Sequence, residues 1–190
     1  MYKESIDKDE LDELPLVQFE GEITLIESKE DYLASIEYLA HQKVLGFDTE
    51  TKPAFKKGVV YEVALLQLAT KDRAFLFRLN KIGLPNGLKS ILENPKIEKI
   101  GVAIRDDIKG LQKLNQFKPG GFVELQERVK DYGIQDFSLK KISAIVLGCR
   151  ISKSQRVTNW EAPELTEAQQ IYAATDAWVS HRIYESLNRQ

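Results

Sequence analysis

The chain has 190 residues, of which 43% are hydrophobic and 29% charged, and its formal net charge is −2. This length suits one well-packed domain, and the composition is that of an ordinary soluble globular protein. No apolar run approaches the ~18 residues of a membrane span, and the N-terminus lacks the apolar core of a signal peptide. A single cysteine, Cys149, excludes an internal disulfide, so we expect a cytoplasmic protein.

The charge is unevenly distributed along the chain. Residues 1–20 hold seven acidic residues against two lysines, so the remaining chain carries a small net positive charge. The same 20 residues show little hydrophobic periodicity, which predicts a flexible acidic leader. We expect residues 21–190 to form a single domain. This balance allows nucleic acid as a partner but does not by itself argue for one.

The first half of the domain has the patterns of strands. Residues 21–26 alternate in polarity, residues 44–48 are apolar, and residues 59–69 and 74–79 are rich in β-branched and aromatic side chains. A turn-like stretch, residues 70–73, joins the last two strands into a predicted hairpin. Between the first two strands, Ser28 is a candidate helix N-cap, and the apolar spacing predicts a helix to about residue 40.

The second half alternates helices and strands. The pattern predicts strands over residues 97–104 and 122–125, and helices over residues 88–92, 106–114, 138–147 and 166–187. The last helix opens with Thr166 and Gln169 at capping-box spacing. Three antiparallel strands followed by alternating helices and strands predict an α/β fold, a mixed sheet with antiparallel and parallel strands and helices on both faces.

Asp48 and Glu50 lie at the end of the predicted strand 44–48. Residues i and i+2 of a strand share a face about 7 Å apart, so two carboxylates there repel unless a positive charge lies between them. A structural ion pair with Lys52, Lys56 or Lys57 in the next loop is one alternative. A bound metal ion is the other, because strand ends in α/β sheets are where ligands usually bind.

Acidic residues at two further positions are also candidates for a cation site. Asp107, or its neighbour Asp106, follows the apolar strand IGVAI where a helix begins, and acids there also favour a helix start. Asp176 lies inside the last helix, in YAATDAW, on a face of small residues where an unpaired carboxylate is costly. Taken singly, each is a surface or capping residue. Only the complete set of acids indicates a cation site.

The set Asp48-x-Glu50, Asp107 and Tyr172-x-x-x-Asp176 resembles the three motifs of the DEDD 3′–5′ exonucleases. A tyrosine four residues before the last aspartate is similar to the motif of the subgroup that contains ribonuclease D and the Werner-type exonucleases. The stretches GFDTE, VALLQL, IGVAIRDD, FVEL and LTEAQQIYAATDAW are similar to the Werner-type domain, over about residues 21–190. The sister subgroup has a histidine five residues before the last aspartate, and that position here is Ile171. The resemblance implies a ribonuclease H-like fold and a metal-dependent 3′–5′ exonuclease that releases 5′-mononucleotides.

The resemblance also implies a role for each acid. Asp48 would bridge two divalent ions, Mg²⁺ or Mn²⁺, while Glu50 and Asp176 would complete one site and Asp107 would hold the other. Such hard ions select carboxylate oxygens, and a pair of them about 3.5–4 Å apart activates water and neutralises the leaving oxygen. Tyr172 would be a catalytic residue that orients the attacking water, because a phenol with a pKa of about 10 is a poor base. We expect His41 and His181 on the surface.

A stretch without acidic residues is the candidate nucleic-acid contact. Residues 137–160 contain five basic residues and no acid. This composition fits either a phosphate-binding strip or a solvated positive face. The candidate phosphate contacts are Arg150, Lys153 and Arg156 in this strip, and Lys56 and Lys57 after the first motif. Phe55 and Tyr61 are candidates to stack on a terminal base, and we expect Trp160 and Trp178 in the core.

Two other functions compete with an active exonuclease. The chain could be a nucleic-acid-binding module that keeps the fold without the chemistry, although repelling carboxylates then have no physical purpose. It could also be a haloacid-dehalogenase-like phosphatase, because FDTET is similar to that family's D-x-D-x-T loop. In that family the second acid is normally aspartate and a helix follows, whereas this sequence predicts a hairpin. The sequence leaves open DNA or RNA, single strands or recessed ends, and the oligomeric state.

Overall fold

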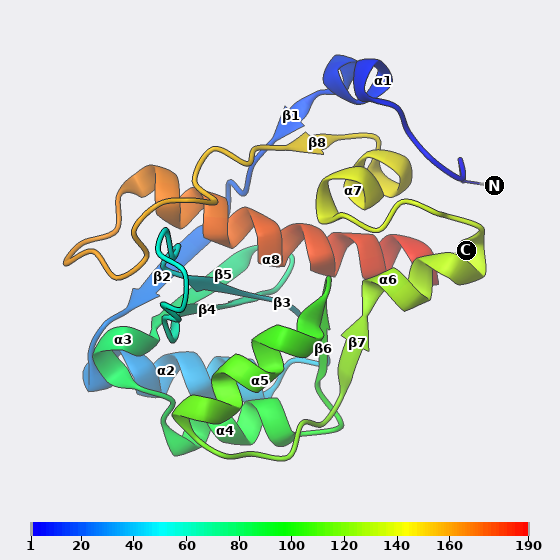
Figure 1. The fold of residues 1–190 in the computed structure, drawn as a ribbon. Helices are drawn as coiled ribbons and strands as arrows, with labels where there is room; N and C mark the ends of the chain where they lie inside the picture. The colour runs from blue at the N-terminus through cyan, green and yellow to red at the C-terminus, as the bar shows by residue number, and fades with distance from the viewer. Residues whose placement is uncertain (1, 190) are drawn as a thin grey trace.

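The computed structural model describes residues 2–189 and shows one mixed six-stranded sheet with helices on both faces (Figure 1). The strand order is β2–β5–β4–β3–β6–β7, which places β3 and β4 at the centre. The strands are β2 (Glu22–Ile26), β3 (Val44–Thr51), β4 (Val63–Ala69), β5 (Arg73–Arg78), β6 (Glu98–Gly101) and β7 (Phe122–Glu124). The predicted α/β fold with a mixed sheet is confirmed.

The antiparallel part of the sheet is the meander of β3, β4 and β5. The other three strands pair in parallel: β2 with β5, β6 with β3, and β7 with β6. The predicted hairpin therefore exists as β4–β5, closed by residues 70–72. The strand at residues 22–26 joins the far edge of this meander, next to β5, so its pairing partner lies about 50 residues later in the chain.

Helices cover the two faces of the sheet in separate groups (Figure 1). One face packs against α2, α4 and α5 through a core that includes Leu39, Leu88 and Leu111. The other face packs against α8, which crosses β3, β4 and β5. The helices are α2 (Lys29–Ala40), α3 (Leu79–Ile82), α4 (Asn86–Glu93), α5 (Ile104–Leu114), α6 (Leu125–Arg128), the 3₁₀ helix η1 (Val129–Tyr132), α7 (Leu139–Leu147) and α8 (Glu167–Asn188). None of the helices in residues 2–189 is long and apolar enough to cross a membrane.

The expectation of a flexible leader differs from the structure, which packs residues 2–20 against the domain. The leader forms a helix, α1 (Lys8–Glu13), and a short strand, β1 (Leu16–Val17), which pairs in parallel with β8 (Arg150–Ile151). Ile6, Leu11 and Phe19 are buried. These widely spaced apolar residues anchor the segment, and the many acids between them hide this pattern in the sequence.

Two predicted strands are shorter than expected, each for a local reason. The strand over residues 59–69 begins only at Val63, where the side chains enter the core; Val59 and Val60 are exposed in the preceding loop. The strand over residues 97–104 spans only residues 98–101, because Ala103 adopts a left-handed conformation with φ 58° and α5 begins at Ile104. The predicted N-cap Ser28 and the capping box at Thr166 are confirmed, and Ser138, where the sequence predicts the start of a helix, is the N-cap of α7.

Candidate active site

The central strand β3 presents its acidic residues to α8. Leu45 and Phe47 point into the core on the side of α2 and α5. Because side chains alternate along a strand, Gly46, Asp48 and Glu50 point to the opposite side, towards α8. The pairing of β3 with β4 shifts register just after Glu50, as at a β-bulge, and such irregularities turn the end of a strand next to a site.

Gly46 lets the backbones of β3 and α8 touch. A Cβ at this position would lie 1.7 Å from the carbonyl oxygen of Ala177. Any larger residue would therefore push α8 away from the strand. Asp176 directly precedes Ala177 in α8, and Asp48 lies two residues after Gly46, so this close approach brings the two carboxylates together.

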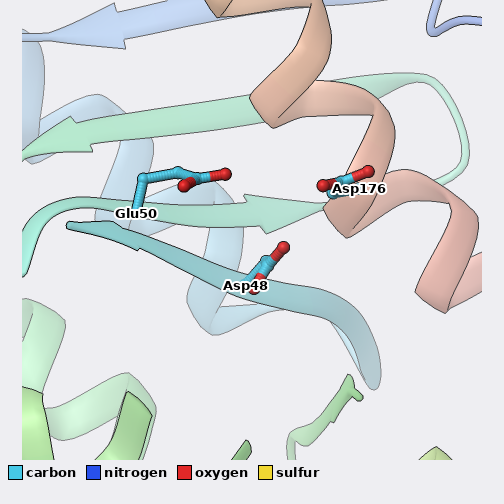
Figure 2. A group of neighbouring side chains, drawn as sticks. All are labelled: Asp48, Glu50 and Asp176. Carbon is cyan, nitrogen blue, oxygen red and sulfur yellow. The ribbon is translucent and has the colours of Figure 1, made fainter. Parts of the chain in front are cut away.

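Three carboxylates meet between β3 and α8 (Figure 2). One oxygen from each of Asp48, Glu50 and Asp176 lies within 4.8 Å of the others. Figure 2 shows Asp48 and Glu50 on the strand and Asp176 on the helix, with their carboxylates directed into one space. Asp176 is buried and the other two are half-buried. The structure thus brings Asp176 to two acids that lie 126 and 128 positions earlier in the sequence.

Burial and mutual repulsion raise the pKa values of these carboxylates. The pKa of Asp48 lies well above its usual value because of desolvation and the charges of Asp176, Glu50 and Asp107. Desolvation, with the charges of Asp176 and Asp107, raises the pKa of Glu50 to about 9. Desolvation also raises the pKa of Asp176 to about 7. Such a cluster either retains protons or binds a cation, since opposite charge restores ionisation.

Tyr172 lies one helical turn before Asp176, and the two side chains share a hydrogen bond, with the phenol as donor. Its ring packs against Trp160, with centroids 6.0 Å apart. Burial, with the charges of Asp176, Glu50 and Asp48, raises the pKa of the Tyr172 phenol. The phenol therefore stays protonated at neutral pH and acts as a hydrogen-bond donor at the edge of the carboxylate cluster.

Asp107 lies beside this cluster on α5 and is not one of its three members. The hydroxyl of Thr49, on β3 between Asp48 and Glu50, donates a hydrogen bond to the Asp107 carboxylate. Desolvation raises the pKa of Asp107, while the Thr49 hydrogen bond lowers it. The side chain of the neighbouring Asp106 is 91% exposed and pairs with Lys109. Asp107 is thus the acid that faces the site.

The start of α5, which carries Asp107, is held by an acid from β7. The Glu124 carboxylate accepts hydrogen bonds from the backbone N–H groups of Ala103 and Ile104, both at 2.9 Å. These are two of the N–H groups that a helix N-terminus leaves without a partner. Glu124 therefore supports the left-handed turn at Ala103 and fixes the direction in which Asp107 enters the site.

The five basic residues of the strip separate into two groups. Lys140 pairs with Asp12 at 4.0 Å, Lys141 pairs with Asp136 at 2.7 Å, and Arg150 donates to the carbonyl of Leu14 at 2.9 Å. By contrast, Lys153 and Arg156 make no ion pair with any described residue. The charge of Lys153 lowers the pKa of Asp176 and that of Arg156 lowers the pKa of Glu50, so these two lie near the carboxylates.

A cavity of about 640 Å³ lies along the loop after β3. Its lining includes Lys56, Tyr61 and Phe55, and Phe55 is 85% exposed. Lys52 also lines this cavity. Its ammonium pairs with Glu161 at 3.3 Å. The ion pair that the sequence suggested for Lys52 therefore forms with Glu161 and not with Asp48 or Glu50. The loop positions Lys56 next to exposed apolar side chains, and Trp160 is in the core as expected.

The carboxylate cluster fits a divalent metal ion. Its members are three oxygen ligands with raised pKa values, and the described residues around them include no histidine or cysteine ligand. Hard ions such as Mg²⁺ and Mn²⁺ prefer this donor set. Asp48, Glu50 and Asp176 would hold such an ion, and Asp107 lies close enough for its charge to raise the pKa values of both strand acids.

Several residues that support the site are not evident from the sequence. Gly46, Thr49 and Glu124 lie inside the stretches GFDTE and FVEL, but their roles depend on contacts with α8 and α5. The expectation that His181 lies on the surface is wrong, because this residue is only 6% exposed. Because α8 is buried on most sides, its sequence has no polar face from which the position of His181, inside or on the surface, could be predicted. His41 is exposed, as expected.

Comparisons with known proteins agree with this geometry. A family profile described as 3′–5′ exonuclease matches residues 23–190. The chain therefore belongs to this 3′–5′ exonuclease family. It is 36% identical over 188 residues to the bifunctional 3′–5′ exonuclease/ATP-dependent helicase WRN of Mus musculus, covering 93% of this chain and 13% of the relative. The chain spans between 13% and 58% of the length of the first curated relatives that it matches.

Solved structures share the fold at lower identity. The Nibbler EXO domain of Aedes aegypti superimposes with a TM-score of 0.81 at 24% identity, covering 91% of both chains. Trypanosoma brucei RNase D, solved in complex with RNA U12, gives a TM-score of 0.77 at 17% identity, covering 89% of this chain and 63% of that one. The predicted likeness to ribonuclease D and Werner-type exonuclease domains is confirmed.

Proposed function

We propose that this chain is a metal-dependent exonuclease that removes 5′-mononucleotides one at a time from the 3′ end of a nucleic acid. The observation that carries the proposal is the meeting of Asp48, Glu50 and Asp176 within 4.8 Å, next to a tyrosine, in a chain of the 3′–5′ exonuclease family. Hydrolysis forms a bond between a water oxygen and the phosphorus and breaks the bond from phosphorus to the 3′ oxygen.

The proposal assigns a role to each residue of the site. Asp48, Glu50 and Asp176 would hold one divalent ion, and Asp107 would hold a second together with Asp48. Two bound ions, Mg²⁺ or Mn²⁺, would make water more acidic and neutralise charge on the leaving oxygen. Tyr172 would orient the attacking water. It is not the base, because its raised pKa keeps the phenol protonated.

The substrate in this proposal is a DNA or RNA strand with a free 3′ end. Lys153 and Arg156 are the basic residues best placed to bind its phosphates, because they lie near the acids and form no ion pair with any residue in 2–189. The RNA complex of the Trypanosoma brucei relative supports RNA as one substrate class. Lys56, with Phe55 and Tyr61, lines the cavity beside the site and would contact the terminal nucleotide.

The remaining parts of the proposal concern organisation and location. Residues 21–190 constitute the exonuclease domain, and residues 2–20 dock onto it. We also propose that the protein works in the cytoplasm, because its one cysteine, Cys149, is an unpaired and buried thiol.

A digestion series with 5′-end-labelled single-stranded DNA, recessed duplex DNA and RNA tests the function. Each substrate is incubated with Mg²⁺, with Mn²⁺ and with EDTA. We expect a ladder of products shortened from the 3′ end and free 5′-mononucleotides, and no cleavage in EDTA. Asp48→Ala and Asp176→Ala should each lower the rate at least ~10³-fold, because each removes a ligand from a charge-stabilising site.

The control variant is Asp106→Asn, which removes an exposed acid one residue from Asp107 and should keep full activity. Asp107→Asn should not. Binding without cleavage under every metal condition would favour the inactive binding module. Release of inorganic phosphate from an intact polymer would favour the phosphatase. Full activity in EDTA would exclude the metal mechanism.

A further inference from the structure

Gln67, in the middle of β4, is a buried amide without a partner. It is fully buried, and within residues 2–189 neither its Nε2 nor its Oε1 finds a hydrogen-bond partner. Burying polar atoms without a partner destabilises a protein, so such a group requires an explanation. All the other residues of β4 are apolar, and therefore Gln67 is the exception within an otherwise hydrophobic strand.

Gln67 lies directly opposite Asp48. The antiparallel register of β3 and β4 pairs Asp48 with Gln67. Residues that pair in this way point to the same face, with Cβ atoms about 4.5–5.5 Å apart. That face is the one covered by α8, because Leu65 and Ala69, two residues before and after Gln67, pack in the same cluster as Ala173 and Ala177.

The polar groups of α8 do not account for the amide. The Thr175 hydroxyl donates to the carbonyl of Ile171 at 2.6 Å, and the Ser180 hydroxyl donates to the carbonyl of Asp176 at 3.0 Å. The Asp48 carboxylate, in contrast, accepts one backbone hydrogen bond, from Thr49 at 2.9 Å, and has further lone pairs available. Asp48 is also the residue that pairs with Gln67 across the two strands.

We propose that Gln67 is a positioning residue for Asp48: when the site holds its metal ion, the amide N–H donates to the Asp48 carboxylate, directly or through one buried water. Buried waters typically bind otherwise unsatisfied groups of this kind. Such a bond fixes the direction in which Asp48 offers its oxygens, as hydrogen bonds to metal-ligating carboxylates do in other metal sites. This inference rests on the proposed metal-dependent function.

The test is Gln67→Met, which keeps the length of the side chain and removes both polar atoms. Mn²⁺ affinity is measured by isothermal titration calorimetry without nucleic acid, and the melting temperature is measured in EDTA. We expect Mn²⁺ affinity to fall about tenfold or more. The melting temperature should stay the same or rise, because the variant removes two unpartnered buried atoms. A purely structural amide would not show this combination.

Leu65→Met is the matched control, since Leu65 is equally buried on the same face of β4 and pairs with Glu50. It should leave Mn²⁺ affinity unchanged. Gln67→Leu is a second apolar variant and should behave like Gln67→Met. Mn²⁺ affinity within twofold of wild type in either Gln67 variant, or a loss accompanied by a lower melting temperature, would overturn the inference. Wild-type protein that binds no Mn²⁺ would overturn the proposed function itself.

Discussion

The hydroxyl of Thr49 on β3 donates a hydrogen bond to the carboxylate of Asp107 on α5. Thr49 is the residue between Asp48 and Glu50, and it points to the face of the sheet opposite to these acids. Its hydrogen bond therefore joins β3, the strand that carries Asp48 and Glu50, to the fourth acid on α5. This hydrogen bond couples the position of Asp107 to the conformation of β3.

Thr49→Val tests that coupling, because valine has nearly the shape of threonine without the hydroxyl. We expect a loss of about 1–3 kcal/mol in the free energy of unfolding, the usual cost of leaving a half-buried acceptor without its donor. Nuclease activity should fall about tenfold, since Asp107 would be free to turn. Thr51→Val, on the same strand but exposed, is the control for both measurements. Equal activity of Thr49→Val and wild type would contradict the coupling.

The raised pKa values predict an unusual pH dependence of stability in the metal-free protein. Burial raises the pKa of Asp176 from 3.8 to about 7 and that of Glu50 from 4.5 to about 9. Above pH ~4 the unfolded chain releases protons that the folded chain retains. Unfolding therefore becomes easier as the pH rises, and the melting temperature in EDTA should fall steadily between pH 5 and pH 9.

Asp176→Asn should flatten this pH dependence, because the variant removes one of the protonated groups. Mn²⁺ should reverse it, since the ion binds the deprotonated carboxylates and is bound more tightly at higher pH. A melting temperature in EDTA that increases between pH 5 and pH 8 would show that the cluster is ionised without metal.

Gly46→Ala should destabilise the protein by about 3 kcal/mol or more, at the upper end of what overpacking costs. The new Cβ would lie 1.7 Å from the carbonyl oxygen of Ala177, and two backbones cannot adjust as side chains do. Activity should also fall, because Asp48 and Asp176 would separate. Gly58→Ala is the comparison: φ there is +83°, but nothing lies within 4 Å, so Mn²⁺ affinity should not change. Wild-type Mn²⁺ affinity in Gly46→Ala would contradict this role.

Lys153 and Arg156 should account for much of the salt dependence of nucleic-acid binding. Binding of labelled single-stranded DNA and RNA, measured by fluorescence anisotropy in EDTA, should weaken when both residues are changed to alanine. The slope of log K against log salt concentration should decrease by about 0.7 for each phosphate that is no longer bound. The paired lysines provide the control: Lys140→Ala with Lys141→Ala should leave the slope unchanged. An unchanged slope without Lys153 and Arg156 would instead assign phosphate binding to Lys56 and Lys57.

Arg150 belongs by sequence with Lys153 and Arg156, and the structure gives it a different role. The sequence shows that a stretch is basic, but it does not show which of the basic side chains bind to other parts of the same chain. The Arg150 guanidinium donates to the Leu14 carbonyl, which lies 136 residues earlier. The same limit applies to the leader, whose partners include residues of β8, α7 and α8.

The carboxylates of the site are easier to predict than the packing around them, because the residue type alone indicates their chemistry. The alternation of one strand places Asp48 and Glu50, and the cost of an acid on a small-residue helix face singles out Asp176. The packing that brings them together cannot be predicted in this way. The close approach of Gly46 to Ala177 joins two segments 131 positions apart, and no local pattern encodes it.

The docking of the leader has a consequence for the order of folding. Its hydrogen bonds from Ile6 to Asp136 and from Phe19 to Thr175 join residues 130 and 156 positions apart. Interactions of such long range have a large loop-closure cost and form late, whereas the β4–β5 hairpin is local. We expect the leader to dock last and to detach first, so amide hydrogens of β1 and β8 should exchange faster than those of β3. A partly opened protein would then keep its carboxylates assembled while the segment carrying Lys153 and Arg156 loses its anchor.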